Sequence, residues 1–253
     1  MRVSHTSGRS GATRRRWASA AGSALLLTVL CACGGGSERA GGPGDAGPTA
    51  ASGPPASTPA PTGIPEVGPR TQRRIPADAR QVVAVYGAGK DSADATVVLY
   101  TKRGSTWQGT RAWPAHNGRK GWTADHHEDD RRSPVGVFTL SDAGGVLPDP
   151  GTKLPYTRSD SFAAPRSWGR SYWHDFDYVI AVDYNRVKGT PPNDPTRPQG
   201  QHKGGGIWLH MDHGSGTSAC VSLSKAGMEY LLRTLDPALH PVVVMGDRAS
   251  LAA

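Results

Sequence analysis

The feature that most constrains this chain is a stretch near its N-terminus rich in Gly and Pro. Residues 34–69 hold 10 Gly and 8 Pro, half of the 36 positions, and Ala, Ser and Thr fill most of the others. Such a segment cannot bury enough apolar surface to offset the entropy lost on ordering, so we expect it to be disordered. The folded part must then come from the residues that follow, and residues 75–253 are enough for one hydrophobic core.

The residues before this stretch are typical of an export signal. Arg14, Arg15 and Arg16 precede a small and apolar run over residues 18–30, too short to span a membrane as a helix. The run ends in Leu-Cys-Ala-Cys, which resembles the site where a bacterial lipoprotein is cleaved and lipidated. We expect residues 1–32 to be a lipoprotein signal peptide, Cys33 to carry the lipid, and residues 33–74 to be a disordered tether. Ordinary cleavage at a nearby small residue stays open as an alternative.

The basic net charge of +8 does not predict a nucleic-acid partner. Five Arg lie in the signal segment, and the remainder holds 24 Lys and Arg against 21 Asp and Glu. No basic stripe accompanies the Trp residues, so we expect them in the core and in groove walls. The group Arg70, Arg73 and Arg74 is interpreted as solvated linker charge rather than as a contact to anionic wall polymers.

The remainder of the chain predicts a mostly β fold. Runs of β-branched and aromatic residues predict strands at residues 81–86, 95–100, 107–113, 135–140, 178–184, 207–211 and 241–245, the first two forming a hairpin. Long loops are expected at residues 117–134 and 185–206, and the second is long enough to act as a lid. One late helix starts at Ser224, a good N-cap, and ends before Asp236-Pro237.

The chemistry-bearing segment covers residues 206–223, GIWLHMDHGSGTSACVSL. Its Cys220 is the one cysteine outside the signal region, and an unpaired thiol in an exported protein suggests a reactive group. An apolar strand ends at His210, and we expect a short hairpin to bring His210 and Cys220 onto neighbouring strands. A nucleophilic thiolate needs such an imidazole as proton acceptor. Small residues before the cysteine, Thr217, Ser218 and Ala219, leave room for a carbonyl whose oxyanion backbone N–H groups could receive.

This segment resembles the signature of L,D-transpeptidases of the YkuD type: a strand-end His, then Ser or Thr, and a Cys followed by an apolar residue. His210, Thr217, Cys220 and Val221 match it. The element Ser133-Pro134-Val135-Gly136-Val137-Phe138 resembles a second motif of the family, with Ser in place of Thr. The pattern departs from the family at Ser218, Ala219 and Ser222, and Met211 follows the histidine where some relatives carry Ser.

The resemblance implies an L,D-transpeptidase-like β-sandwich that acts on peptidoglycan stem peptides, without cofactor. Cys220 would form a thioester and pass the acyl group to an amine, which gives a 3→3 cross-link, and carbapenem-type β-lactams would acylate the same thiol. Such a domain, exported and lipid-anchored at the outer face of the bacterial cytoplasmic membrane, would face the cell wall.

Three other interpretations remain open at this point. The same thioester could be hydrolysed, which would make the protein a carboxypeptidase or amidase, or the domain could bind the wall without catalysis. Metal sites at His210, Asp212 and His213 or at residues 126–130 are disfavoured, because these side chains do not form closed ligand sets, and a solvated loop is expected at residues 126–130. We also expect His210 to be the base that lowers the pKa of Cys220. His213 is expected to be mobile and solvated, because it lies in a turn with Gly214 and Gly216.

Overall fold

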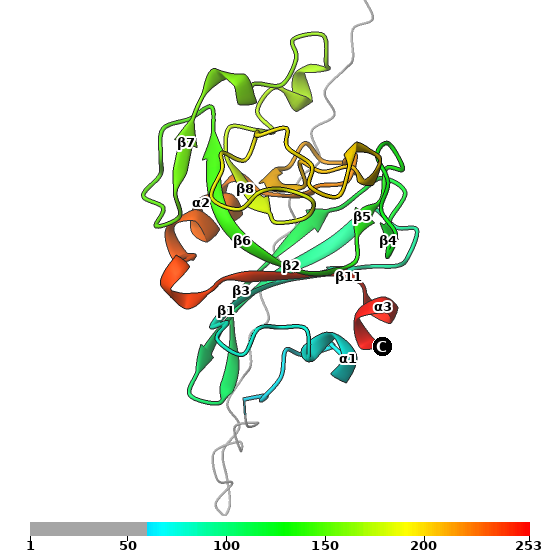
Figure 1. Ribbon diagram of the computed structural model, residues 1–253, viewed down its shortest axis with the longest axis vertical. Coiled ribbons are helices and arrows are strands. Elements are labelled where there is room, and N and C mark those ends of the chain that lie inside the picture. The colour runs from blue at the N-terminus through cyan, green and yellow to red at the C-terminus, as the bar shows by residue number, and fades with distance from the viewer. Residues whose placement is uncertain (1–59) are drawn as a thin grey trace, which may run out of the picture. The chain divides into compact units, whose positions relative to one another are not determined.

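The computed structural model describes residues 60–253; the expected signal peptide, Cys33 and most of the tether lie outside them. The described chain is mostly β (Figure 1). The strands of the main sheet are β1 (Gln81–Gly87), β2 (Asp94–Arg103), β3 (Thr106–His116), β6 (Gly136–Gly145), β7 (Tyr156–Arg158), β8 (Val179–Val182), β9 (Trp208–Met211), β10 (Val221–Leu223) and β11 (Val242–Asp247). Two short strands, β4 (Trp122–Thr123) and β5 (Ser133–Pro134), pair separately. The α-helices are α1 (Pro69–Gln72), α2 (Lys225–Thr234) and α3 (Arg248–Ala252).

The main sheet bends round and closes on itself. Its order is β11-β1-β2-β3-β10-β9-β8-β6-β7, and β11 also pairs with β6. The expected hairpin of the first two strands is confirmed, since β1 and β2 pair antiparallel. The mostly β, sandwich-like fold expected from the sequence is therefore confirmed, and each expected strand run lies on a strand of this sheet.

Apolar residues form two clusters, one inside the closed sheet and one outside it. The inner cluster contains Trp122, Leu209 and the apolar face of α2, with Met228 and Leu231 fully buried. Ser224 caps α2 as expected, because its hydroxyl accepts a hydrogen bond from the N–H of Gly227.

The outer cluster changes the expected start of the folded region. Ile64 is 2% exposed and packs in a cluster with Tyr86 and Leu251 of α3. The Tyr86 hydroxyl donates to the carbonyl of Pro65 at 2.6 Å, and the N–H of Gly68 donates to the carbonyl of Leu251 at 2.8 Å. Residues 60–74, assigned to the disordered tether from their composition, are thus packed on the domain. Their few apolar side chains find a complementary surface that local composition does not reveal.

The pairing of β9 with β10 also differs from expectation. The two strands are neighbours, but they run parallel, with His210 opposite Ser222 and Leu209 opposite Val221. The segment between them therefore crosses over instead of turning back as a hairpin. On its way it forms a bridge between Thr217 and Gly118, which fixes the residues before Cys220 against the loop after β3.

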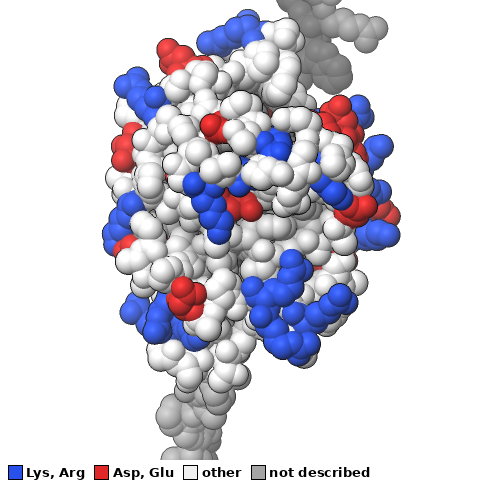
Figure 2. Space-filling model, viewed as in Figure 1, with Lys and Arg blue, Asp and Glu red and all other residues white. Residues whose placement is uncertain are grey.

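Within residues 60–253, no helix is long and apolar enough to cross a membrane. On the face seen in Figure 2, acidic and basic side chains are interspersed, apart from one basic group that gathers over the region of α1. The sequence around α1 holds Arg70, Arg73 and Arg74. These arginines therefore belong to the folded surface and not to linker.

Candidate active site

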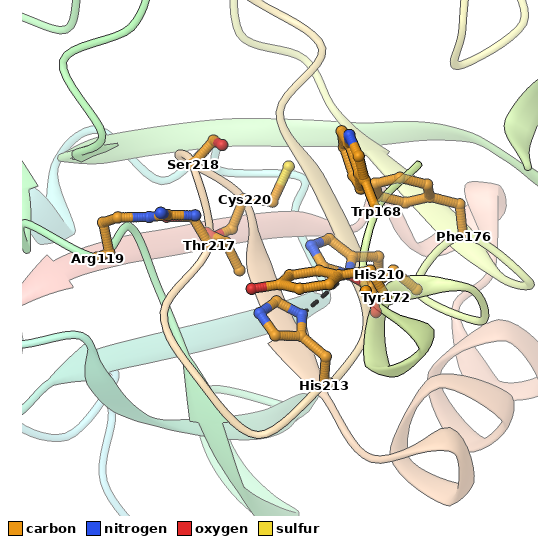
Figure 3. A pocket seen from close by; sticks show the side chains of 11 residues that line it. Arg119, Trp168, Tyr172, Phe176, His210, His213, Thr217, Ser218 and Cys220 are labelled. Atoms are coloured by element: carbon orange, nitrogen blue, oxygen red, sulfur yellow. Dashed lines mark hydrogen bonds and ion pairs between the residues drawn. The ribbon is translucent and has the colours of Figure 1, made fainter. Parts of the chain in front are cut away.

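Two cavities meet at Cys220. The first, here called the aromatic cavity, has a volume of about 330 Å³. Trp168, Tyr172 and Phe176 line it together with His210, Cys220 and other residues (Figure 3). The second, the charged cavity, measures about 270 Å³ and is lined by charged side chains of both signs, and by Gly205, Gly206 and Cys220 among others. A group held on Cys220 can therefore be approached from two sides.

The thiol of Cys220 sits among backbone groups. The N–H of Trp208 donates to Sγ at 3.4 Å, and Sγ lies 3.6 Å from the carbonyl oxygen of Gly206. Burial raises the pKa of the thiol to about 11; the Trp208 N–H opposes this rise, and the carboxylate of Asp175 adds to it. Burial therefore favours the neutral thiol in the resting site, in the direction opposite to the lowered pKa expected from the sequence.

His210 is held in one tautomer. Its side chain is buried, and Nδ1 lies 2.7 Å from the backbone carbonyl oxygen of Met211, so Nδ1 carries the proton and Nε2 keeps its lone pair. Burial lowers the pKa of His210 to about 4, although the Met211 carbonyl opposes this shift. The imidazole is therefore neutral at physiological pH and able to accept a proton at Nε2.

Cys220 and His210 share the aromatic cavity but make no direct hydrogen bond within the described residues. A neutral thiol beside a neutral imidazole can transfer its proton during attack on a carbonyl, as general-base chemistry requires. A permanent thiolate–imidazolium pair is disfavoured here, because burial raises the pKa of the thiol and lowers that of the imidazole.

The residues before Cys220 form a tight, fixed turn. The hydroxyl of Thr217 donates to the Cys220 carbonyl at 2.7 Å, and the hydroxyl of Ser133 donates to the Ala219 carbonyl at 2.6 Å. The backbone N–H groups of Ala219 and Cys220 donate no turn or side-chain hydrogen bond within residues 60–253, so they are free to receive an oxyanion. Ser218 is exposed and lines both cavities.

Ala219 fits this turn without strain. Among described non-glycine residues, a positive φ occurs at Glu66, Asp129, Arg131, Asn185 and His240, and not at Ala219. A Cβ at this position therefore costs nothing in backbone conformation. Gly206, with φ of 62°, does require the left-handed region, and this turn brings its carbonyl towards Sγ.

Ser222 takes part in a network beside the site and not in it. Its hydroxyl donates to Oδ1 of Asp212 at 2.7 Å, and Nδ1 of His116 lies 2.8 Å from the same oxygen. Burial works against ionisation of Asp212, but these hydrogen bonds outweigh it and lower the pKa of the carboxyl. Asp212 is thus occupied, which removes it from any metal site with His210 and His213.

His213 lies in a different environment from the one expected. Its side chain is 3% exposed, and Nδ1 lies 2.9 Å from Oδ2 of Asp175, itself 4% exposed. The imidazole packs against Tyr172 in a tilted arrangement, with 4.3 Å between ring centroids. The expectation of a mobile, solvated histidine is wrong, because the segment that precedes β8 covers the turn.

The loop at residues 126–130 is a wall of the charged cavity. Asp130 accepts hydrogen bonds from the backbone N–H groups of His127 and Arg132, and its carboxylate contacts Nδ1 of His126. His126 is 4% exposed, so the loop is packed on this side, although the side chains of Glu128 and Asp129 are exposed. Within residues 60–253, no three His, Cys, Asp or Glu side chains converge as metal ligands would.

The expected lid at residues 185–206 supplies only Gly205 and Gly206 to the charged cavity.

Comparisons with known proteins bear on this arrangement. A family profile described as "YkuD: L,D-transpeptidase catalytic domain" matches residues 90–244. The chain belongs to this family. The match includes both cavities and Cys220, and it agrees with the resemblance drawn from the sequence motifs. Membership associates the chain with peptidoglycan enzymes.

No curated protein shows a significant match to the chain. Among solved structures it is similar to Bd1075 from Bdellovibrio bacteriovorus, with a TM-score of 0.38 and 15% identity over 74% of this chain and 53% of that one. It is also similar to the helical cell shape determining protein Pgp2 from Campylobacter jejuni, with a TM-score of 0.37 and 16% identity over 66% and 48%. The chain thus spans about half the length of each.

Several residues of the site carried no signal in the sequence. Asp175 and the three aromatic residues of the cavity come from residues 168–176, more than thirty positions before His210 and without a recognisable motif. The group that orients His210 is a backbone carbonyl, and any residue type supplies one. Only the closure of β8 against β9 brings these parts together.

Proposed function

We propose that the protein is a cysteine acyltransferase that cross-links peptidoglycan stem peptides. Cys220 attacks an amide carbonyl of a donor stem while Nε2 of His210 takes the thiol proton. The terminal amino acid leaves with that proton, and the stem remains as a thioester. An amine of a second stem then attacks the thioester, and the thiol is restored. The observation that carries the proposal is the meeting of two cavities at Cys220, beside a histidine held with Nε2 free.

The neutral state of the pair supports this cycle. A thiol whose pKa is raised to about 11 by burial gains nucleophilicity only when His210 removes its proton. The N–H groups of Ala219 and Cys220 donate no other backbone hydrogen bond within residues 60–253, so they are available to stabilise the negative charge that develops on the carbonyl oxygen. No metal or organic cofactor takes part in any step.

The test is incubation of the purified protein with muropeptides of known structure, followed by mass spectrometry of the products and of the protein. We expect cross-linked dimers and, transiently, an acyl adduct on Cys220. Trimmed monomers alone would assign the protein to the hydrolases. No change in the muropeptides, with wall binding retained, would make it a binding module.

We further propose that Cys33 carries a lipid anchor and that the domain works at the outer face of the cytoplasmic membrane. The Leu-Cys-Ala-Cys pattern after the apolar run supports this. Palmitate labelling of cells that produce the protein should be lost in Cys33→Ala and retained in Cys31→Ala. Equal labelling of both variants and the wild type would contradict the anchor.

A further inference from the structure

The aromatic cavity contains a second acid–base pair that the proposed reaction does not use. The side chains of His213 and Asp175 are 3% and 4% exposed, and they contact each other at 2.9 Å (dashed line in Figure 3). Both line the cavity that contains Cys220. Burying two ionisable groups is costly unless they are paired, and pairs of this kind concentrate at functional sites.

The imidazole of His213 has an unmet hydrogen-bonding capacity. Both ring nitrogens are buried without an aligned hydrogen-bond partner in the part of the chain that the structure describes, even though Nδ1 lies close to the Asp175 carboxylate. The carboxylate of Asp175 is the nearest partner for Nδ1. Nε2 has no partner, although buried polar atoms in native proteins are normally satisfied, and His213 lines the cavity. A substrate group in the cavity would supply the missing partner.

The walls of this cavity suit a positively charged group. Trp168 lies 6.0 Å from Tyr172 and 6.3 Å from Phe176 between ring centroids, and Tyr172 packs against His213. Aromatic faces attract cations, more so when water is excluded. Asp175 also lines this cavity, and its carboxylate adds negative charge when ionised, which points to an ammonium group as the ligand.

The charges around Asp175 allow it to act near neutral pH. Burial raises the pKa of Asp175 to about 6, and His213 opposes that rise. Asp212 and His174 also face it, while His210 and Arg119 line the same cavity. Arg119 is exposed, so solvent screens its repulsion of a cation. His210 is buried and has a pKa of about 4, so it is too weak a base to keep a second proton near neutral pH.

We propose that the Asp175–His213 pair binds the protonated amine of the acyl acceptor and removes its surplus proton, as a second acid–base pair separate from His210. This inference rests on the proposed transfer reaction. An alkyl amine enters mainly as an ammonium ion at neutral pH, because its pKa is about 10. One N–H proton passes to Nε2 of His213, directly or through one water, and the freed lone pair forms the bond to the thioester carbon.

The rest of the step balances at Cys220. The C–S bond breaks as the new C–N bond forms. The second proton lost by the nitrogen passes through Nε2 of His210 to Sγ, which restores the thiol. His213 then releases its proton to solvent. Water, as a competing nucleophile, needs no such deprotonation before binding, so the pair should favour transfer over hydrolysis.

The test measures how the acyl-enzyme of the full chain, purified in detergent, partitions between an amine acceptor stem and water. Asp175→Asn and His213→Gln should lower the transfer-to-hydrolysis ratio by about tenfold or more at pH 7. Raising the pH to about 9.5, where more of the acceptor is free amine, should restore most of the transfer-to-hydrolysis ratio in both variants. Asp177→Asn is the matched control. Asp177 is a buried carboxyl of the same segment that pairs with His174 and lines neither cavity. The transfer-to-hydrolysis ratio of Asp177→Asn should therefore equal that of the wild type.

Because the ratio counts only acylated protein, partial misfolding does not alter it. An unchanged ratio in both variants, or a reduced ratio that a higher pH fails to restore, would overturn the inference. Failure of the wild type to form any acyl adduct with stems would instead overturn the proposed function. The two failures are therefore distinguishable.

Discussion

Cys220→Ser should abolish cross-linking, with a loss of at least about 10³-fold in kcat/KM, equivalent to about 4 kcal/mol of transition-state stabilisation. A serine hydroxyl is much harder to deprotonate than a thiol, and the weak base His210 is not suited to do it. The substitution keeps the size of the side chain, so the contact to the Trp208 N–H can persist. The measurement is the rate of dimer formation from muropeptides by wild type and variant.

Intact-mass spectra after exposure to a carbapenem give an independent readout. The wild type should gain one adduct, and Cys220→Ser none. An equal unfolding midpoint for the two proteins serves as the control for folding. A variant that still cross-links would show that another residue carries the acyl group, and wall binding retained without any activity in the wild type would favour a binding module.

Local patterns predicted much of the fold and the proximity of His210 and Cys220. Alternation of β-branched residues indicated the strands, and the apolar spacing after Ser224 indicated α2. His210 and Cys220 were placed on neighbouring strands because few residues separate them. The direction of the pairing was missed, because short separation suggests a hairpin, and the crossover depends on the bridge between Thr217 and Gly118.

The electrostatics of the site could not be predicted from local sequence. Glycines on the C-terminal side of His213 suggested a solvated turn, but Asp175 and Tyr172 from a distant segment enclose it. The raised pKa of Cys220 and the lowered pKa of His210 both come chiefly from burial. Burial is a property of the closed sheet and its loops, so motif spacing does not report it.

His210→Gln should lower the rate of Cys220 acylation by about 10² to 10⁴-fold, the range of general-base contributions. Gln keeps a polar group near the Met211 carbonyl but offers no lone pair of comparable basicity. In the wild type, the acylation rate should fall as pH drops through about 4, where His210 becomes protonated, since the imidazolium cannot accept the thiol proton. This acidic limb should be absent in the variant, because Gln does not titrate.

The alkaline behaviour separates the base from the thiol. Alkylation by iodoacetamide should rise towards pH 11 in wild type and in His210→Gln, because burial and not His210 raises the pKa of Cys220. His174→Gln is the control for replacing a histidine outside the site, since that side chain is 75% exposed and pairs with Asp177. Its alkylation profile should match that of the wild type. A midpoint near 8.5 in wild type would mean that the thiol is solvated. If His213→Gln lowered the acylation rate as much as His210→Gln, the assignment of His210 as the base would be wrong.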